Sequence, residues 1–261
     1  MKKSLLTLSL LAASFFGFSQ QMANAGFENW TSGNPNNWGS FDAMLTSFGA
    51  STTLETQVSP GNSGSSAAQL QTQLVALVAT TLPGVISSGP ITYAGGIDIK
   101  GSPYTQNPSS FDFYCKYAPV NGDTALAQAV FTSWNGTSRD TLGFAGTYII
   151  GAQATFLQVN CPITWLLGGA PDTVSMVFIS SSGTTPQANT TLTIDDVNMN
   201  LVTGVKEPFM LNTYSVYPNP AVNELNIVSK DQKAVKANIY DVTGRMIQTV
   251  DFVNGKAKLN T

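Results

Sequence analysis

The chain has 261 residues, of which 43% are hydrophobic and 10% charged, with a formal net charge of −3 and no histidine. This apolar content is enough for a packed core, so we do not expect disorder across the whole chain. The acidic balance disfavours nucleic-acid binding, and the lack of histidine excludes Ser-His-Asp and Cys-His nucleophiles and histidine-based metal sites.

The N-terminus has the form of a secretory signal peptide. Two lysines precede an apolar run from Leu5 to Phe18, which ends beside small residues. We predict that residues 1–19 are removed by cleavage between Ser19 and Gln20, with the small-x-small site at 23–25 as a second candidate. The chain is therefore expected to be exported.

Beyond residue 20 the pattern is that of short strands separated by turns. Gly, Ser, Thr, Asn and Pro recur about every ten residues, and helical periodicity is almost absent, which predicts an all-β sandwich or barrel. The most apolar stretch, residues 74–86, contains threonine, proline and glycine and is too short to span a bilayer, so we expect no transmembrane segment.

The segment FDFYCKY, residues 111–117, alternates regularly. One face is apolar and is assigned to the core: Phe111, Phe113, Cys115 and Tyr117. The other face is polar and is assigned to solvent: Asp112, Tyr114 and Lys116. Tyr114 is the aromatic residue that packing explains least, because it lies between two charged neighbours on this polar face.

The segment TLTIDDVNMNL, residues 191–201, contains a change of phase. Its apolar residues are even-numbered before Asp195–Asp196 and odd-numbered after it: Leu192, Ile194, Val197, Met199 and Leu201. One extra residue, a β-bulge, would return all five to the core. Such a kink suits a calcium site or a hydrogen-bonded strand crossing, or it leaves two solvated aspartates.

Two cysteines, Cys115 and Cys161, occur in this predicted exported chain. They could form one disulfide, as exported proteins often do, or remain two separate buried thiols. The sequence leaves both alternatives open.

The charge distribution indicates a domain boundary. Residues 24–203 contain ten acidic and three basic residues, whereas residues 204–261 contain seven basic and five acidic ones. With a proline close to the change, we predict a first domain at 20–203, a linker at 204–212 and a second domain at 213–261.

The first domain resembles jelly rolls of the carbohydrate-binding-module type. The motifs NAGFENW and NNWGSF near its start and TLTIDDVNM near its end are similar to the first and last strands of those modules. The segment GSPYTQNPSSFDFYCKYAPVNGDTA is similar to the carbohydrate metabolism domain of exported Bacteroidetes proteins. The resemblance implies two antiparallel sheets in jelly-roll order, with the first and last strands adjacent.

The same resemblance implies a structural calcium ion. In related modules such an ion is held by an early glutamate and a late aspartate, which correspond here to Glu28 and Asp195, with Asp196 as the further candidate. The bulge expected at Asp195–Asp196 supports this transfer independently.

The second domain resembles the type IX secretion C-terminal sorting domain, a small immunoglobulin-like β-sandwich. The resemblance is carried by YPNPAVNELNIV and KANIYDVTGRMIQTVDF, in particular by the sorting-motif residues Tyr217, Pro218, Asn219, Pro220, Asp241 and Gly244. Leu225 and Ile227 are expected in its core, and Gly244 should supply the positive φ of a hairpin turn. The alternative is a generic immunoglobulin-like module. Family members continue past the LNT position, so we expect this copy of the domain to be C-terminally incomplete.

Sugar binding requires aromatic faces for stacking and polar side chains around them. Four tryptophans are candidates, although a tryptophan in a sandwich is more often in the core, and Trp134 immediately precedes a turn. We hypothesise a glycan site with four members: Tyr114, Trp134, Asp112 and Lys116.

Hydrolysis of a glycan would need two carboxyl groups that face each other across a cleft. The candidates by residue type are Asp42, Glu55, Asp98, Asp112, Asp123, Asp140 and Asp172. Nothing in the sequence pairs any two of them, so no catalytic residue is assigned.

Three Asp-Thr-apolar tripeptides resemble the O-glycosylation motif of Bacteroidetes exported proteins. Their acceptor residues would be Thr124, Thr141 and Thr173. Asp-Thr pairs also suit turns, so modification and turn formation are alternative readings.

The leading hypothesis is a secreted or cell-surface protein that binds glycan and is exported by type IX secretion. A carbohydrate-active hydrolase with an unrecognised carboxylate pair is the second hypothesis, and a structural or adhesive surface protein without a sugar ligand is the third.

Overall fold

The structure is a computed structural model that describes residues 20–201, 214–230, 236–241 and 243–260. The chain divides into two compact units, Met1–Val202 and Thr203–Thr261. The predicted signal peptide, 1–19, and the predicted linker, 204–212, lie outside the described residues. The two units are described in turn below.

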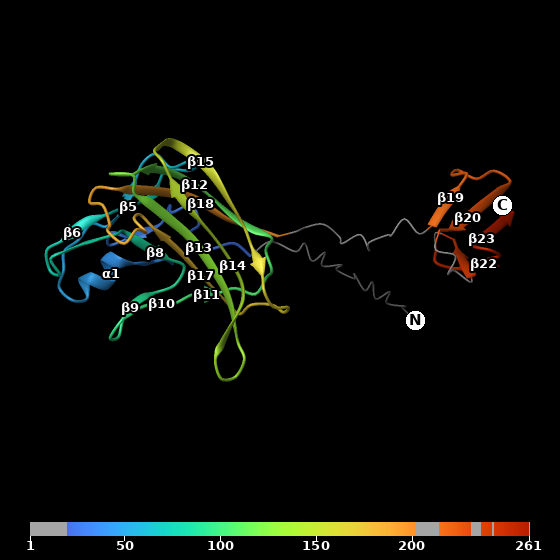
Figure 1. Cartoon of the computed structure of the whole chain (residues 1–261), viewed down its shortest axis with the longest axis horizontal. Coiled ribbons are helices and arrows are strands. Elements are labelled where there is room, and N and C mark those ends of the chain that lie inside the picture. Colours follow the sequence, from blue (N-terminus) through green and yellow to red (C-terminus); the bar gives the residue numbers. More distant parts are fainter. Residues whose placement is uncertain (1–19, 202–213, 231–235, 242, 261) are drawn as a thin grey trace, which may run out of the picture. The chain divides into compact units, whose positions relative to one another are not determined.

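The first unit is a sandwich of two antiparallel sheets (Figure 1). The smaller sheet has five strands in the order β15-β12-β18-β5-β4. Their bounds are β4 (Glu55–Val58), β5 (Ala67–Gln71), β12 (Ser110–Ala118), β15 (Gln153–Pro162) and β18 (Thr191–Asn200).

The larger sheet has seven strands in the order β16-β14-β13-β17-β8-β3, and β11 also pairs with β17. Their bounds are β3 (Gly39–Ser40), β8 (Val85–Ser87), β11 (Ser102–Pro103), β13 (Thr124–Trp134), β14 (Arg139–Ile150), β16 (Thr164–Trp165) and β17 (Thr173–Ile179). Three short hairpins complete the unit: β1 (Trp30–Thr31) with β2 (Asn34–Pro35), β6 (Gln73–Val75) with β7 (Thr80–Leu82), and β9 (Ile91–Tyr93) with β10 (Ile97–Ile99).

The core lies between the two sheets. The four residues predicted on the apolar face of β12 are all buried: Phe111, Phe113, Cys115 and Tyr117. The ring of Phe113 meets that of Phe178 on β17 edge-on, with centroids 5.0 Å apart, and so joins the two sheets. The predicted fold class, an all-β sandwich, is confirmed.

The predicted bulge in β18 is confirmed. Asp112 is opposite Asn198 and Tyr114 is opposite Asp195, so two residues of β18 face one residue of β12. Asp196 has φ of 49°, which is the local kink. The flanking apolar residues return to the core, four of them buried and Leu201 partly buried: Leu192, Ile194, Val197 and Met199.

The N-terminal segment lies beside the last strand of the sandwich. The amide of Val197 donates to the carbonyl of Ala25 at 3.0 Å, and that of Met199 to Gln21 Oε1 at 2.8 Å. The resemblance to jelly-roll modules implies this proximity of the first and last segments.

One short helix, α1 (Phe41–Thr46), covers part of the outer face of the seven-stranded sheet. Ser40 caps it, because its Oγ accepts the amide of Ala43 at 3.0 Å. Phe41, Met44 and Leu45 belong to a second apolar cluster that packs against Val177 and Ile179 of β17. The sequence did not predict this helix, since six residues are too few to show helical periodicity.

The two cysteines are free thiols, both buried. Cys161 is opposite Phe111 in the register of β15 with β12, whereas Cys115 is opposite Leu157. Four residues of strand, about 13 Å, therefore separate their positions, which exceeds the Cα separation of about 7 Å that a disulfide tolerates. Of the two alternatives that the sequence leaves open, the structure has the two buried thiols.

The second unit contains a three-stranded sheet, β19-β20-β23, and a hairpin, β21-β22. Their bounds are β19 (Tyr214–Tyr217), β20 (Glu224–Ser229), β21 (Lys236–Tyr240), β22 (Met246–Asp251) and β23 (Lys256–Asn260). Leu225 and Ile227 pack against its small apolar cluster, as predicted.

The hairpin turn has the predicted chemistry. Asp241 Oδ1 accepts the amides of Thr243 at 2.9 Å and Arg245 at 3.0 Å, and Gly244 has φ of 82°. The other sorting-motif residues, Tyr217, Pro218, Asn219 and Pro220, end β19 and lead toward β20. No helix among the described residues of either unit is long and apolar enough to cross a membrane.

Candidate functional site

The outer face of the five-stranded sheet carries a set of polar side chains that we call the polar face. Its members come from four adjacent strands and are Gln69, Asp112, Tyr114, Lys116, Phe156, Gln158, Asn160, Thr193, Asn198 and Asn200. Antiparallel register brings them together, because Tyr114 is opposite Gln158 while Asp112 is opposite both Asn160 and Asn198. Lys116 is opposite Thr193, which is in turn opposite Gln69.

Asp112 anchors the middle of the polar face. Its side chain is buried, and Oδ2 accepts hydrogen bonds from Asn200 Nδ2 at 2.5 Å and Asn198 Nδ2 at 3.5 Å. Asn198 Nδ2 also donates to Asn200 Oδ1 at 2.6 Å. The carboxylate therefore fixes the orientation of two amide groups rather than standing free at the rim.

Two aromatic rings lie on the polar face, Tyr114 and Phe156, and both are partly exposed. Lys116 Nζ lies 4.2 Å from the centre of the Phe156 ring, which is a cation–π contact. The positive charge of Lys116 is thereby held against a ring. The face therefore presents amides, hydroxyls and two aromatic rings, one of which is in contact with Lys116.

Trp134 does not belong to this face. It ends β13 in the seven-stranded sheet, where its side chain is 55% exposed. Its amide donates to Asp172 Oδ2 at 2.8 Å, and Asp172 Oδ1 also accepts from Arg139 Nη1 at 2.6 Å. Hydrogen bonds from the Thr173 hydroxyl and from Arg139 lower the pKa of Asp172 to about 2. Of the four predicted ligand residues, the structure brings together Asp112, Tyr114 and Lys116 and leaves Trp134 on the other sheet.

The sequence did not point to the amides of the polar face. Gln158 and Asn160 alternate along β15, and Asn198 and Asn200 along β18 after the bulge. Alternation alone could have assigned each pair to one face of its own strand. It could not have brought the two pairs together, since they are about 40 residues apart in the sequence.

The three predicted metal ligands, Glu28, Asp195 and Asp196, all contact one loop, residues 61–66. Asp195 is buried, and its Oδ2 accepts the amides of Asn62 at 2.6 Å and Ser63 at 3.3 Å. Asp196 Oδ1 accepts the Ser63 hydroxyl at 2.6 Å. Glu28 Oε1 accepts the amides of Ser65 at 2.9 Å and Ser66 at 3.1 Å.

Burial raises the pKa of Asp195 to about 6. The exposed Glu28 has a lowered pKa because the Ser65 hydroxyl and the Ser66 amide donate to it. A Cβ added to Gly61 would meet the carbonyl oxygens of Ser63 and Ser66 and, at 2.8 Å, Asp195 Oδ2. The backbone at Gly61 therefore packs tightly against Asp195, and the described residues contain no group of three Asp, Glu, Cys or His side chains placed to hold a metal.

A pair of buried carboxyl groups, Asp42 and Glu55, lies near α1. Glu55 accepts the amides of Val85 at 2.7 Å and Asp42 at 2.8 Å, while Asp42 accepts the amides of Leu54 and Glu55, both at 3.0 Å. Burial, and then the negative charge of Asp42, raise the pKa of Glu55 well above its usual range. Through these hydrogen bonds the pair connects α1 to the first residues of β4 and β8.

The same pair bears on the hydrolase hypothesis. Asp42 and Glu55 line a cavity of about 440 Å³ together with Trp30. However, all four carboxyl oxygens accept backbone amides, and the two groups contact each other instead of standing about 5–10 Å apart across a cleft. Their geometry is that of a pair of carboxyl groups that stabilises the fold.

The three predicted acceptor threonines all lie in strands of the seven-stranded sheet. Thr141 is exposed, whereas Thr124 and Thr173 are partly buried. The Thr173 hydroxyl donates to Asp172 Oδ1 at 2.6 Å and accepts from Arg139 at 3.0 Å, so it already has two partners. O-glycosylation stays a prediction at these positions.

Comparison with known proteins identifies the second unit. Residues 215–261 match the family model described as "Secretion system C-terminal sorting domain". The unit is a sorting domain, as its motifs predict, and such a domain implies export to the cell surface or secretion. No curated protein matches the chain.

Solved structures share the architecture of the first unit. A candidate glycoside hydrolase of Bacteroides thetaiotaomicron is 15% identical and covers 72% of this chain and 70% of its own, with a TM-score of 0.53. A family 28 carbohydrate-binding module specific for non-crystalline cellulose is 13% identical, covers 70% and 95%, and has a TM-score of 0.39. A family 22 xylan-binding domain of Paenibacillus barcinonensis is 13% identical, covers 65% and 94%, and has a TM-score of 0.35. The first of these similarities shows a common β-sandwich fold.

Proposed function

We propose that the sandwich domain binds an uncharged glycan chain on the polar face. The observation that carries this proposal is the alignment of side-chain amides from β15 and β18 on either side of β12, the strand that carries Tyr114. Amides both donate and accept hydrogen bonds, which matches the hydroxyl groups of sugars. Tyr114 supplies a partly exposed ring on which a pyranose can stack.

The electrostatics of the face favour a neutral ligand. Asp112 is buried beneath two asparagine amides, and Lys116 is held on the ring of Phe156. The carboxylate of Asp112 would repel an anionic sugar, and the ammonium group of Lys116 is already in contact with an aromatic ring. The face therefore recognises hydroxyl geometry rather than charge.

The proposed place of action is outside the cell. The sorting domain at 215–261 supports delivery by the type IX secretion machinery, which would be a partner of this chain. The predicted signal peptide would supply the first export step. Together they would present the sandwich domain at the cell surface or in the medium.

We also propose that a structural calcium ion binds beside the 61–66 loop. Glu28, Asp195 and Asp196 all contact this loop, and carboxylate oxygens of this kind are ligands that calcium prefers. The ion would neutralise the buried Asp195. Excess chelator should lower the melting temperature of the chain, and unchanged melting would remove the ion from this proposal.

The glycan proposal is tested by a glycan array on the mature chain, followed by calorimetric titration with the best ligand. Tyr114→Ala should weaken binding about tenfold, because it removes a stacking platform. The matched control is Tyr148→Ala, which removes an exposed tyrosine from the outer face of the other sheet and should leave the affinity unchanged. Equal affinities for the wild type and Tyr114→Ala would refute the site. The absence of any bound glycan on the array would refute the function.

A further inference from the structure

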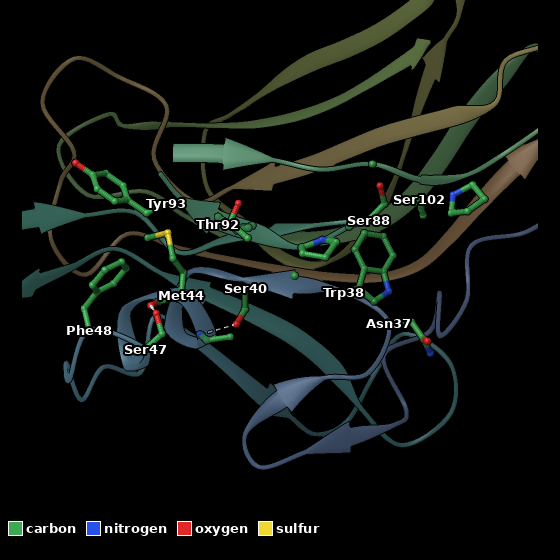
Figure 2. A pocket seen from close by; sticks show the side chains of 17 residues that line it. Asn37, Trp38, Ser40, Met44, Ser47, Phe48, Ser88, Thr92, Tyr93 and Ser102 are labelled. Carbon is green, nitrogen blue, oxygen red and sulfur yellow. Dashed lines mark hydrogen bonds between the residues drawn. The ribbon is translucent and has the colours of Figure 1, made fainter. Parts of the chain in front are cut away.

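A cavity of about 660 Å³ lies on the opposite side of the sandwich from the polar face, between α1 and the segments 88–93 and 101–103. Figure 2 shows Trp38, Ser88 and Ser102 toward one end and Phe48 and Tyr93 toward the other. We call it the hydroxyl cavity, because its polar side chains are serines, a threonine and an asparagine. None of its lining residues carries a charge.

One hydroxyl of this cavity lacks a partner. Ser102 Oγ is buried and forms no hydrogen bond among the described residues. Ser88 is different, since its Oγ donates to the carbonyl of Val174 at 2.9 Å and accepts the amide of Met176 at 3.0 Å. A buried hydroxyl without a partner costs free energy that a bound polar group would recover. Ser102 lines this end of the cavity, but its Oγ is covered in this structure, so a ligand hydroxyl or carbonyl would meet it after the side chain turns toward the cavity.

A second hollow, of about 460 Å³, adjoins the hydroxyl cavity, and we call it the apolar groove. It is formed by α1, the β6–β7 turn and the β9–β10 hairpin, and nearly all of its lining is apolar. Leu77 and Ile97 on its walls are 55% and 56% exposed. A cluster of exposed large apolar side chains around a groove marks a site that binds apolar groups.

The two hollows share a boundary. Met44, Phe48 and Tyr93 line both of them. The rings of Phe48 and Tyr93 meet edge-on with centroids 5.9 Å apart, and each side chain is 54% exposed. A single ligand can therefore occupy both hollows and pass along this aromatic pair.

We propose that the hydroxyl cavity and the apolar groove together bind an uncharged amphiphile. Its hydroxylated head lies near Ser102, its aliphatic tail lies along Leu77 and Ile97, and Phe48 with Tyr93 hold the junction. Each hollow has the size of a small-molecule site, and no lining residue offers a charge for an ionic head. This site is separate from the polar face and does not depend on the proposed glycan function.

The test uses hexyl, heptyl and octyl β-glucosides below their micelle concentrations, titrated into the full chain by calorimetry. The affinity should rise about fourfold for each added CH₂ group, as expected for burial of an aliphatic tail. Glucose alone should bind far more weakly, and Tyr114→Ala should not change the glucoside affinity. An affinity that is independent of tail length, or that is lost in Tyr114→Ala, would overturn the proposal.

Two pairs of variants locate the ligand. Ile97→Glu places a charge in the apolar groove and should reduce octyl glucoside binding more than tenfold. Its control, Leu74→Glu, alters an apolar side chain that is 68% exposed and lines neither hollow, so it should have no effect. If the glucosides fail to bind and Ile97→Glu instead dissociates a dimer, the groove receives a second copy of the chain and the proposal is wrong.

Ser102→Ala tests the head end. It should lower the octyl glucoside affinity about fivefold, the effect of one hydrogen bond, and leave the gain in affinity per added CH₂ group unchanged. The melting temperature should not fall, because the hydroxyl has no partner within the described protein. Ser88→Ala, which removes a bonded hydroxyl, should lower the melting temperature instead. An unchanged octyl glucoside affinity in Ser102→Ala, or a smaller gain per added CH₂ group, would contradict the assignment of the head end.

Discussion

The two outer faces of the sandwich differ in the polarity of their side chains and in how far they are covered. The seven-stranded sheet has apolar residues on its outer side, and α1 with its cluster packs over Val177 and Ile179. The five-stranded sheet presents amides, hydroxyls and Tyr114, which remain partly exposed. A sheet face with apolar side chains needs a covering element, whereas a polar face can stay open. The five-stranded sheet is therefore the face that can offer polar side chains to the hydroxyl groups of a sugar.

The largest expected effect comes from removing the buried carboxyl group of Glu55, which connects α1 to the seven-stranded sheet. Glu55→Ala leaves the amides of Asp42 and Val85 without their acceptors, so the free energy of unfolding should fall by about 2–4 kcal/mol. Urea denaturation measures this loss. Glycan affinity should be retained below the transition, and its loss in a folded Glu55→Ala protein would show that the two faces are coupled.

A smaller loss is expected on the open face. Asp112→Ala removes the acceptor of two asparagine amides and should lower the free energy of unfolding by about 1–3 kcal/mol while weakening glycan binding. Asp140→Ala, which removes an acceptor on β14 of the other sheet, is the control and should not affect glycan binding. If Asp112→Ala bound glycan normally, the anchored amides would not be part of the site.

The pH dependence should distinguish the covered face from the open one. The pKa of Glu55 is raised in the folded state, so its contribution to stability is fully present below about pH 4.3 and declines as pH rises through the folded pKa. The glutamine side chain of the Glu55→Gln variant does not titrate. As the pH rises, the wild type should therefore lose stability relative to Glu55→Gln. A difference in their free energies of unfolding that stays constant with pH would contradict the raised pKa of Glu55.

The smallest effect is expected for Lys116→Met. This change removes the cation–π contact with Phe156 and keeps the length of the side chain, so stability should fall by about 0.5–1 kcal/mol. Affinity for a neutral glycan should change less than for Tyr114→Ala. A large loss of affinity in Lys116→Met would show that the ligand is anionic.

Alternation predicted the strands of the sandwich and their inward faces. The phase change around Asp195–Asp196 also predicted a bulge, since only one inserted residue could keep both halves of β18 in the core. The sorting domain was predicted from the resemblance of two motifs to its family, and the turn residues Asp241 and Gly244 were consistent with it. These features depend on residues that are close together in the sequence, and the sequence alone can therefore predict them.

Features that depend on register were not predictable. Trp134 was grouped with Tyr114 although they belong to different sheets, and a single sequence does not assign strands to sheets. The pairing of Asp42 with Glu55 requires a six-residue helix and the loop after it. The amides on either side of β12 come from strands that only the folded sheet brings together.

The central claim is that glycan binds the polar face, and the side-chain amide signals of the ¹⁵N-labelled chain test it most directly by nuclear magnetic resonance. Titration with the glycan selected on the array should shift the NH₂ signals of Gln158, Asn160, Asn198 and Asn200 at one common dissociation constant. If these signals stay in place while resonances of β13, β14 or the hydroxyl cavity shift, glycan binds elsewhere and the claim is wrong.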